Sequence, residues 1–285
     1  MPVSLFSSPL RTGLRRVIFT VQHELVVASP FIRAQEANWL VQELGSKRSS
    51  LTRVDVLTDV RSECVLNGSL ELEALNVLSK SIHSANMVNL PRLHAKVYIA
   101  DSSFALITSA NLTPSGLDAN YEYGVGISDT GLVRQIRSDM QRYMSVGNVL
   151  TPEMLERLQG IAADVAKVLG PVERTHEKEM SARFRAVLKK AQIAFLQAQI
   201  GERSAHALFS DAILFILGSG PLSTRQLHPR IQQLFPDLCN DTEILVINGQ
   251  EFGKKWKHTV RNVQQALKKT GKIGFDGSMW MLAKH

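Results

Sequence analysis

The sequence predicts an α/β protein: a mixed sheet flanked by helices, then a helical linker, then a small domain of helices and one hairpin. Three observations support this prediction. Short apolar runs of strand length alternate with helical segments over roughly the first 145 residues. A continuous helical pattern follows. The last 80 or so residues contain three helical stretches that precede an Asp-Gly turn.

The elements of the first part follow from the apolar pattern. A first helix precedes the apolar run at Leu25, and amphipathic spacing predicts further helices around Trp39–Leu44, Leu70–Leu78 and Leu132–Met144. Short apolar runs predict strands at Leu25–Ile32, Val54–Leu57, Met87–Leu90, Leu93–Ala100 and Phe104–Ser109.

The helical pattern of the middle part begins at Thr151, a suitable N-cap with Pro152 at the first helical position. A second apolar stripe runs from Met180 to Ala198 at spacings of three and four. We therefore divide the chain of 285 residues into three expected parts, 1–148, 149–203 and 204–285.

Composition and charge narrow the function classes. Two cysteines, Cys64 and Cys239, exclude a disulfide scaffold and favour a reducing, cytoplasmic location. The most apolar stretch, 205–218, is shorter than a membrane span requires.

Residues 1–170 contain 16 Lys and Arg and 16 Asp and Glu residues, whereas residues 171–285 contain 17 and 10. The basic excess therefore lies at one end, as expected for a neutral domain joined to one that meets a polyanion. A solvated basic helix without a partner is the alternative.

Four polar residues gather around two predicted strands. His94 and Lys96 are two residues apart on one strand, and Ser109 and Asn111 are two apart at the end of the next. Pairing the strands would bring together an imidazole, an ammonium, a hydroxyl and a carboxamide. Such groups can bind a tetrahedral phosphate and attack its phosphorus.

The joint spacing His-x-Lys, four residues, Asp101, seven residues, Ser-x-Asn resembles the signature of the phospholipase D superfamily, in its single-motif nuclease branch. Asn120 and Glu122 resemble the downstream acidic motif of that family. Thr108 departs from the Gly that usually precedes the Ser, and its branched side chain narrows the approach to the phosphate.

This resemblance implies a phospholipase D-like nuclease domain at 1–148 and a two-step reaction. His94 would form a phosphohistidine while a second histidine protonates the leaving oxygen, and water would hydrolyse the intermediate. Glu122 would orient His94, and Asp101 would fix its turn. Single-motif members work as homodimers, so we expect a homodimer through this domain, with no metal and no cofactor.

The C-terminal part is predicted to be a winged helix. In its third helix, Lys254–Thr270, the stripe Trp256, Val260, Val263 and Leu267 forms the core side. The polar side of this helix, on which Gln264 is placed, carries cations and amides. Cations can contact the phosphates of DNA, and Asn, Gln and Arg side chains can hydrogen-bond to base edges. The candidate DNA-binding residues are Lys254, Lys255, Lys257, His258, Arg261, Asn262, Gln265, Lys268 and Lys269. The stretch from Phe252 to Leu282 resembles the winged helix of Mrr-like restriction proteins.

The leading hypothesis is a dimeric DNA endonuclease, with a role in restriction or phage defence and a defence partner protein by analogy. A lipid phosphodiesterase and a DNA-binding scaffold with an inactive nuclease fold are the alternatives, and RNA is not excluded as substrate.

Overall fold

The computed structural model of the chain describes residues 2–169, 194, 204–236, 238–247 and 249–283. The chain forms two compact units, Met1–Gln199 and Ile200–His285. The predicted stripe from Met180 to Ala198 lies outside the described residues except for Ala194.

The first unit is built on an eight-stranded mixed sheet, which confirms the predicted fold class. Strands β2, β3 and β4 are parallel, and every other neighbouring pair is antiparallel. In spatial order the strands are β1 (Val3–Ser7), β7 (Tyr123–Ile127), β6 (Phe104–Thr108), β5 (Val97–Ala100), β2 (Glu24–Ala28), β3 (Arg53–Thr58), β4 (Ala85–Asn89) and β8 (Asn148–Val149).

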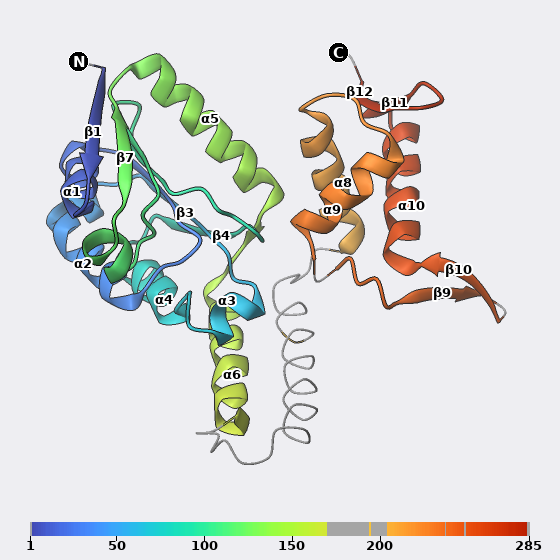
Figure 1. Ribbon diagram of the computed structural model, residues 1–285, viewed down its shortest axis with the longest axis horizontal. Coiled ribbons are helices and arrows are strands. Elements are labelled where there is room, and N and C mark those ends of the chain that lie inside the picture. Colours follow the sequence, from blue (N-terminus) through green and yellow to red (C-terminus); the bar gives the residue numbers. More distant parts are fainter. Residues whose placement is uncertain (1, 170–193, 195–203, 237, 248, 284–285) are drawn as a thin grey trace. The chain divides into compact units, whose positions relative to one another are not determined.

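Helices cover both faces of this sheet (Figure 1). On one face lie α1 (Arg11–Thr20), α2 (Ala34–Leu44) and α4 (Leu72–Ser81), and α6 (Pro152–Leu169) packs against α4. Leu155 and Leu158 of α6 are fully buried in the core of this face. The long helix α5 (Thr130–Val146) lies on the other face, where Arg137 forms an ion pair with Glu24 of β2. The short helices are η1 (Gly45–Ser49), α3 (Ser62–Leu66) and η2 (Ser115–Ala119).

Three strands of the sheet, β1, β7 and β8, were not predicted from the sequence. Strand β7 is rich in glycine, a poor strand former. Gly126 is required there because an added Cβ would lie 2.6 Å from the ring of Phe6 and 2.7 Å from that of Phe104. These two rings pack edge to face with centroids 6.4 Å apart. Packing between rings from β1 and β6 therefore overrides the local preference of β7.

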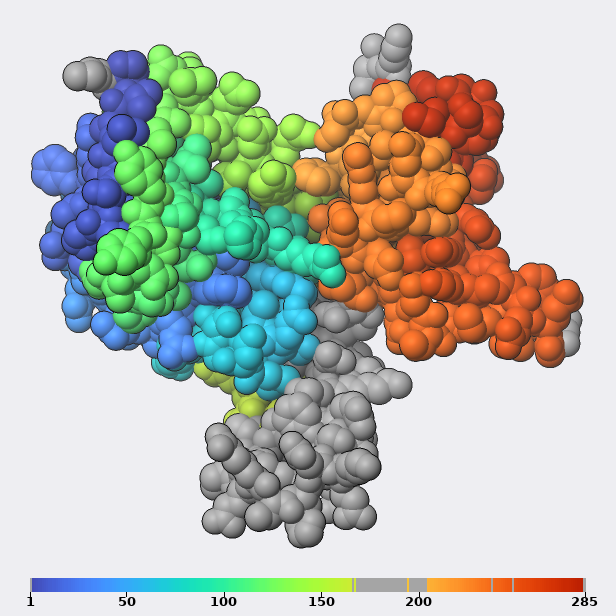
Figure 2. Space-filling model, in the orientation of Figure 1, coloured from blue at the N-terminus to red at the C-terminus, as the bar shows by residue number. Residues whose placement is uncertain are grey.

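The described residues of the second unit form three helices and two hairpins. Its elements are α8 (Ala205–Leu217), α9 (Thr224–Leu234), β9 (Ile244–Ile247), β10 (Gln250–Lys254), α10 (Lys255–Lys269), β11 (Ile273–Phe275) and β12 (Trp280–Leu282). Leu222 forms an isolated bridge with Trp280. The hairpin of β9 and β10 projects from the unit (Figures 1 and 2) and was not predicted, although Asn-Gly at 248–249 is a hairpin signal.

The core stripe predicted for α10 is buried: Trp256, Val260, Val263 and Leu267 are each at most 5% exposed. Gln264, which the sequence placed on the polar side, is also buried, with 1% exposure. The stripe is wider than expected because Gln264 lies beside Val260 and Leu267, which are four residues before it and three residues after it on the helix. Among the residues described, no helix combines the length and apolar character that a membrane crossing needs.

Candidate active site

The segment that carries His94 and Lys96 precedes β5, whereas the sequence placed both residues within a strand. The chain turns at Arg92, whose φ is 62°, and its amide donates to Oδ2 of buried Asp59 over 3.0 Å. The turn delays the start of β5 to Val97. The pairing continues past the strand ends, since the Thr108 amide donates to the Lys96 carbonyl over 3.0 Å.

His94 and Lys96 differ in burial. The His94 side chain is exposed, whereas Lys96 is only 7% exposed, and its Nζ donates to the His94 carbonyl over 2.9 Å. Burial lowers the pKa of Lys96, and the nearby Glu122 carboxylate acts in the opposite direction. Lys96 therefore links the His94 backbone to the neighbourhood of Glu122. A buried ammonium is a suitable counter-charge for a phosphate.

Ser109, Asn120 and Glu122 form a connected hydrogen-bond network at the ends of β6 and β7. Ser109 Oγ donates to Glu122 Oε2, and Asn120 Nδ2 donates to Glu122 Oε1 over 3.1 Å. The Tyr123 amide donates to Ser109 Oγ over 3.1 Å, and the Ser109 amide donates to the Tyr123 carbonyl over 3.0 Å. Both Glu122 oxygens are thus engaged within this network. The orienting role of Glu122 toward His94 stays a prediction.

Thr108 occupies the position where the family pattern has Gly. Its Oγ1 donates to the Tyr123 carbonyl over 3.0 Å and accepts from the Ala110 amide over 3.2 Å. Thr108 pairs with Gly124 of β7, where an added Cβ would lie only 3.0 Å from the Thr108 Cβ. The branched side chain is accommodated because its neighbour in the sheet lacks one.

Two positioning residues were not found from the sequence. Ser8 Oγ accepts from the Glu122 amide and donates to the Asn120 carbonyl, both over 2.6 Å. The hydroxyl of Tyr98, which is fully buried, donates to the carbonyl of Ala110 over 3.3 Å. Desolvation raises the Tyr98 pKa, so the phenol stays protonated and serves as a donor. The Ser8 contacts join segments that no local pattern connects, whereas the Tyr98 contact lies across two strands that the sequence predicts to pair.

Asp101 holds the turn between β5 and β6 against the start of β2. Its carboxylate accepts from the amides of Gln22, His23 and Glu24 over 2.8, 2.9 and 2.7 Å. Its φ is 52°, a left-handed conformation that Asp adopts more readily than most residues. These contacts agree with the scaffold role of Asp101, which stays a prediction.

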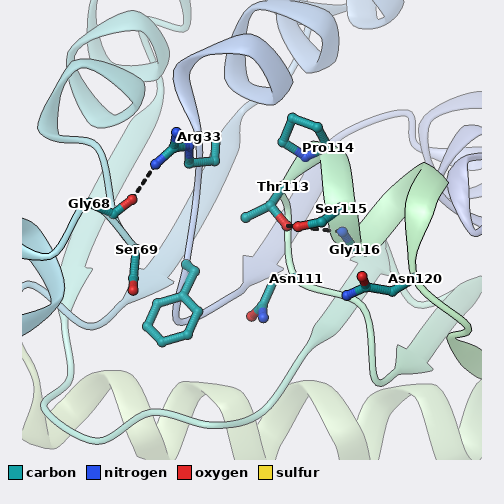
Figure 3. A pocket seen from close by; sticks show the side chains of 10 residues that line it. Arg33, Gly68, Ser69, Asn111, Thr113, Pro114, Ser115, Gly116 and Asn120 are labelled. Atoms are coloured by element: carbon teal, nitrogen blue, oxygen red, sulfur yellow. Dashed lines mark hydrogen bonds between the residues drawn. The ribbon is translucent and has the colours of Figure 1, made fainter.

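Asn111 lines a cavity of about 470 Å³ next to the Ser109 network. Its Oδ1 is buried without a hydrogen-bond partner among the described atoms. Asn120 also lines the cavity, and Figure 3 shows Asn111, Asn120 and Ser69 around the same space. Asn120 therefore joins the cavity to Glu122.

The candidate DNA-binding residues lie on or just before α10. Most of them are exposed, among them Arg261, Asn262, Gln265, Lys268 and Lys269. Two cations at the beginning of the helix are ion-paired within the unit, Lys254 with Asp241 and Lys255 with Glu243. Lys257 lies over the Trp256 ring, and His258 Nε2 contacts the Phe252 carbonyl at 2.5 Å. The last two turns of α10 thus present the more accessible cations.

Over the described ranges, the His, Cys, Asp and Glu side chains form no group of three or more that could hold a metal ion. Cys64 and Cys239 are buried free thiols.

Comparison with solved structures gives distant likenesses. Nuc from Salmonella typhimurium, a phospholipase D family member, is 18% identical over 52% of this chain and 96% of its own, with a TM-score of 0.43. NucT from Helicobacter pylori is 19% identical over 51% and 96%, with a TM-score of 0.42. Phosphatidylserine synthase from Haemophilus influenzae Rd KW20 is 18% identical over 67% and 47%, with a TM-score of 0.49.

Sequence comparisons are more informative for the first unit. A comparison with curated proteins gives no match. The family model described as "Cardiolipin synthase, PLD-like domain" matches residues 14–144, a little under half of the chain. The matched range contains His94, Lys96, Asp101, Ser109 and Glu122. Residues 14–144 are therefore similar to the PLD-like domain that this family model describes.

Proposed function

We propose that this protein cleaves DNA without a metal ion, through a phosphohistidine on His94, as a homodimer. The family match supports the coarser statement that the first unit cleaves phosphodiesters. The observation that carries the proposal is the arrangement of buried Lys96 between the His94 backbone and Glu122, with Ser109 bonded to the same carboxylate. These are the motif groups that phosphoryl transfer requires.

The chemistry follows from these groups. The neutral imidazole of His94 attacks phosphorus, a P–N bond forms, and the P–O bond to the leaving oxygen breaks. A second histidine donates the proton that the leaving oxygen needs. Lys96, Ser109 and Asn111 stabilise the charge on the non-bridging oxygens. Water then attacks the phosphohistidine, its proton is accepted by the second histidine, and His94 is released.

A second copy of the chain is proposed to supply the second histidine. An exposed apolar patch supports this, formed by Leu5 of β1, Ile107 of β6 and Tyr123 of β7, which are 66%, 39% and 54% exposed. Leu5 and Ile107 both pair with Val125, so their side chains share one face of the sheet. The patch borders the site because Ser109 bonds Tyr123. Exposed apolar patches of this kind mark interaction surfaces.

The second unit is proposed to be a winged helix whose α10 meets DNA. The order α8, α9, α10 and the hairpin of β11 and β12, with Leu222 bridged to Trp280, supports this. The exposed cations of α10 suit a phosphate backbone. A role in restriction or phage defence, with a defence partner protein, remains part of the proposal.

The test is cleavage of plasmid and single-stranded DNA in excess EDTA, by the wild type and by His94→Ala. Because His94 is exposed, the variant should fold like the wild type. We expect cleavage in EDTA by the wild type and a loss of about 10³-fold or more in the variant. Cleavage that needs metal and survives the mutation would contradict the assignment. DNA binding without cleavage under all conditions would favour an inactive scaffold.

A further inference from the structure

Apart from Asn111, the residues that line the cavity beside the Ser109 network have no role in the proposed chemistry. It measures about 470 Å³, within the range of ligand-binding pockets. Its lining contains the aromatic ring of Phe31, the amides of Asn111 and Asn120, and hydroxyls that include Ser69. Because Asn111 belongs to the motif and Asn120 bonds Glu122, a group in this cavity would adjoin the phosphate.

Hydrogen bonds from the Ser29 side chain and between backbone groups hold the walls of the cavity together. Ser29 Oγ donates to the Phe31 carbonyl over 2.8 Å and accepts from the Leu112 amide over 3.0 Å. The Arg33 amide donates to the Leu112 carbonyl over 3.1 Å, and Ile32 and Leu112 form a parallel bridge. The segments that carry Phe31 and Asn111 are thus locked together. A preformed cavity costs little ordering energy on binding.

The charge of the lining argues against a second phosphate. Arg33 is its charged side chain, and the guanidinium donates to the Gly68 carbonyl and lies 3.2 Å from Glu71 Oε1. That charge is therefore compensated. The Asn111 Oδ1 is a buried acceptor that lacks a donor among the described atoms. The cavity thus suits a neutral group with a flat face and hydrogen-bonding edges.

We propose that this cavity is a nucleobase subsite, which receives one base next to the scissile phosphate. The Phe31 ring supplies a stacking face, and Asn111, Asn120 and Ser69 supply hydrogen bonds. A base can enter only when it is unstacked, so the subsite selects single-stranded or locally opened nucleic acid. This inference rests on the proposed nuclease function and defines its substrate more closely.

The experiment crosses a change in the substrate with a change in the protein. The substrates are single-stranded DNA oligonucleotides with one natural phosphodiester among uncleavable methylphosphonate linkages, which fixes the scissile position. In one series the nucleotide on either side of that position is abasic. The proteins are the wild type, Phe31→Leu, which keeps an apolar side chain but loses the flat face, and Phe19→Leu as a matched control. Phe19 is 81% exposed on α1.

For the wild type, removing the base on one side should lower kcat/KM by about fivefold or more. Phe31→Leu should lower kcat/KM on the intact substrate by a similar factor and show little further loss on the abasic one. Phe19→Leu should behave like the wild type on both.

Three outcomes would overturn the subsite. If the wild type cleaves intact and abasic substrates equally, the nucleobase subsite is contradicted, but the nuclease function is not. A base effect of the same size in Phe31→Leu would place the base elsewhere. If no oligonucleotide is cleaved but phosphatidylglycerol vesicles are hydrolysed, the nuclease function fails, and the subsite fails with it.

Discussion

Ser109 and Lys268 are both exposed polar residues, but their surroundings differ. Ser109 is bonded to Glu122 and Tyr123, and Glu122 is in turn held by Asn120 and Ser8. Lys268 lies in the last turn of α10, and its described contact is the Phe275 ring, 5.8 Å from Nζ. The first arrangement fixes a direction for each group, whereas the second leaves long side chains free to follow a charged partner.

This difference teaches what each region can contribute. Catalysis gains from groups that are already oriented where charge develops, so the loss of one such group is costly. Binding to a phosphate backbone gains from several adaptable cations, each with a small and nearly independent effect. We therefore expect large, coupled effects of substitution around Ser109 and small, additive effects along α10.

Among the substitutions that compare these two regions, Lys96→Met should have the largest effect. The change removes a buried ammonium beside the site and keeps the length of the side chain. We expect kcat to fall by about 10²–10³-fold. The folded state should be as stable as before or more stable, because burial of the ammonium no longer has to be compensated. Initial rates of DNA cleavage and urea unfolding measure the two quantities.

Lys167→Met is the matched control, because Lys167 is 77% exposed on α6. If Lys96→Met retains full activity, or loses activity only because it unfolds, the expected large effect of substitutions around Ser109 on catalysis is wrong.

Asp101→Ala should destabilise the first unit by about 2–3 kcal/mol, since three amides lose a charged acceptor. Fluorescence of Trp39, which lies in this unit, can follow unfolding in denaturant once Trp256 and Trp280 are replaced by Phe in the reference protein as well. Asp101→Gly separates backbone strain from the lost acceptor, because Gly adopts the φ of 52° freely. Cleavage per folded molecule should change little. A large loss of kcat in a stable variant would contradict the scaffold role.

The next effect is on the free energy of unfolding of the second unit, which should depend on the protonation of His228. Burial, with further contributions in the same direction from Lys257 and Arg261, lowers the pKa of His228 to about 4. The unfolded chain, with a His pKa near 6.5, therefore binds more protons between pH 4 and 6.5. The free energy of unfolding should fall by about 2 kcal/mol as pH decreases through that window.

The His228 ring lies 5.5 Å from the Trp256 ring, so tryptophan fluorescence in a Trp39→Phe background reports this unfolding. The pH dependence should be weaker in His228→Phe by the stated amount. Equal slopes in the two proteins would show that His228 is not the titrating group.

The sequence predicted the long helices well because apolar stripes of helical period mark them: the helix predicted at Lys254–Thr270 differs from α10 by one residue at each end. It predicted the motif residues because the resemblance names them. The sequence could not predict the hydrogen-bond network of the motif residues, because Ser109 contacts Glu122 through the pairing of β6 with β7. Strand β7 was not predicted because its two glycines lower its strand propensity.

Contacts between distant segments account for most of the rest. Ser8 reaches Asn120 and Glu122 across more than a hundred residues, and no local pattern signals it. Asp59 holds the turn before His94 from the end of β3. Gln264 of α10 was misplaced because helical period alone does not decide how wide a buried stripe is. In each case the deciding information is tertiary.

The smallest effects are expected along α10. If the seven cations between 251 and 272 contact about six phosphates, the logarithm of the DNA-binding constant should fall with log salt at a slope near −5. Lys268→Ala should reduce the magnitude of that slope by about 1, without changing kcat at saturating DNA. Lys268→Ala with Lys269→Ala should reduce it by about 2, because independent phosphate contacts add. Titrations by fluorescence anisotropy at several salt concentrations measure the slope, with Lys167→Ala as the control. If the double variant reduces the magnitude of the slope no more than either single variant does, the two cations act as one coupled site. In that case α10 would resemble the Ser109 network instead of differing from it.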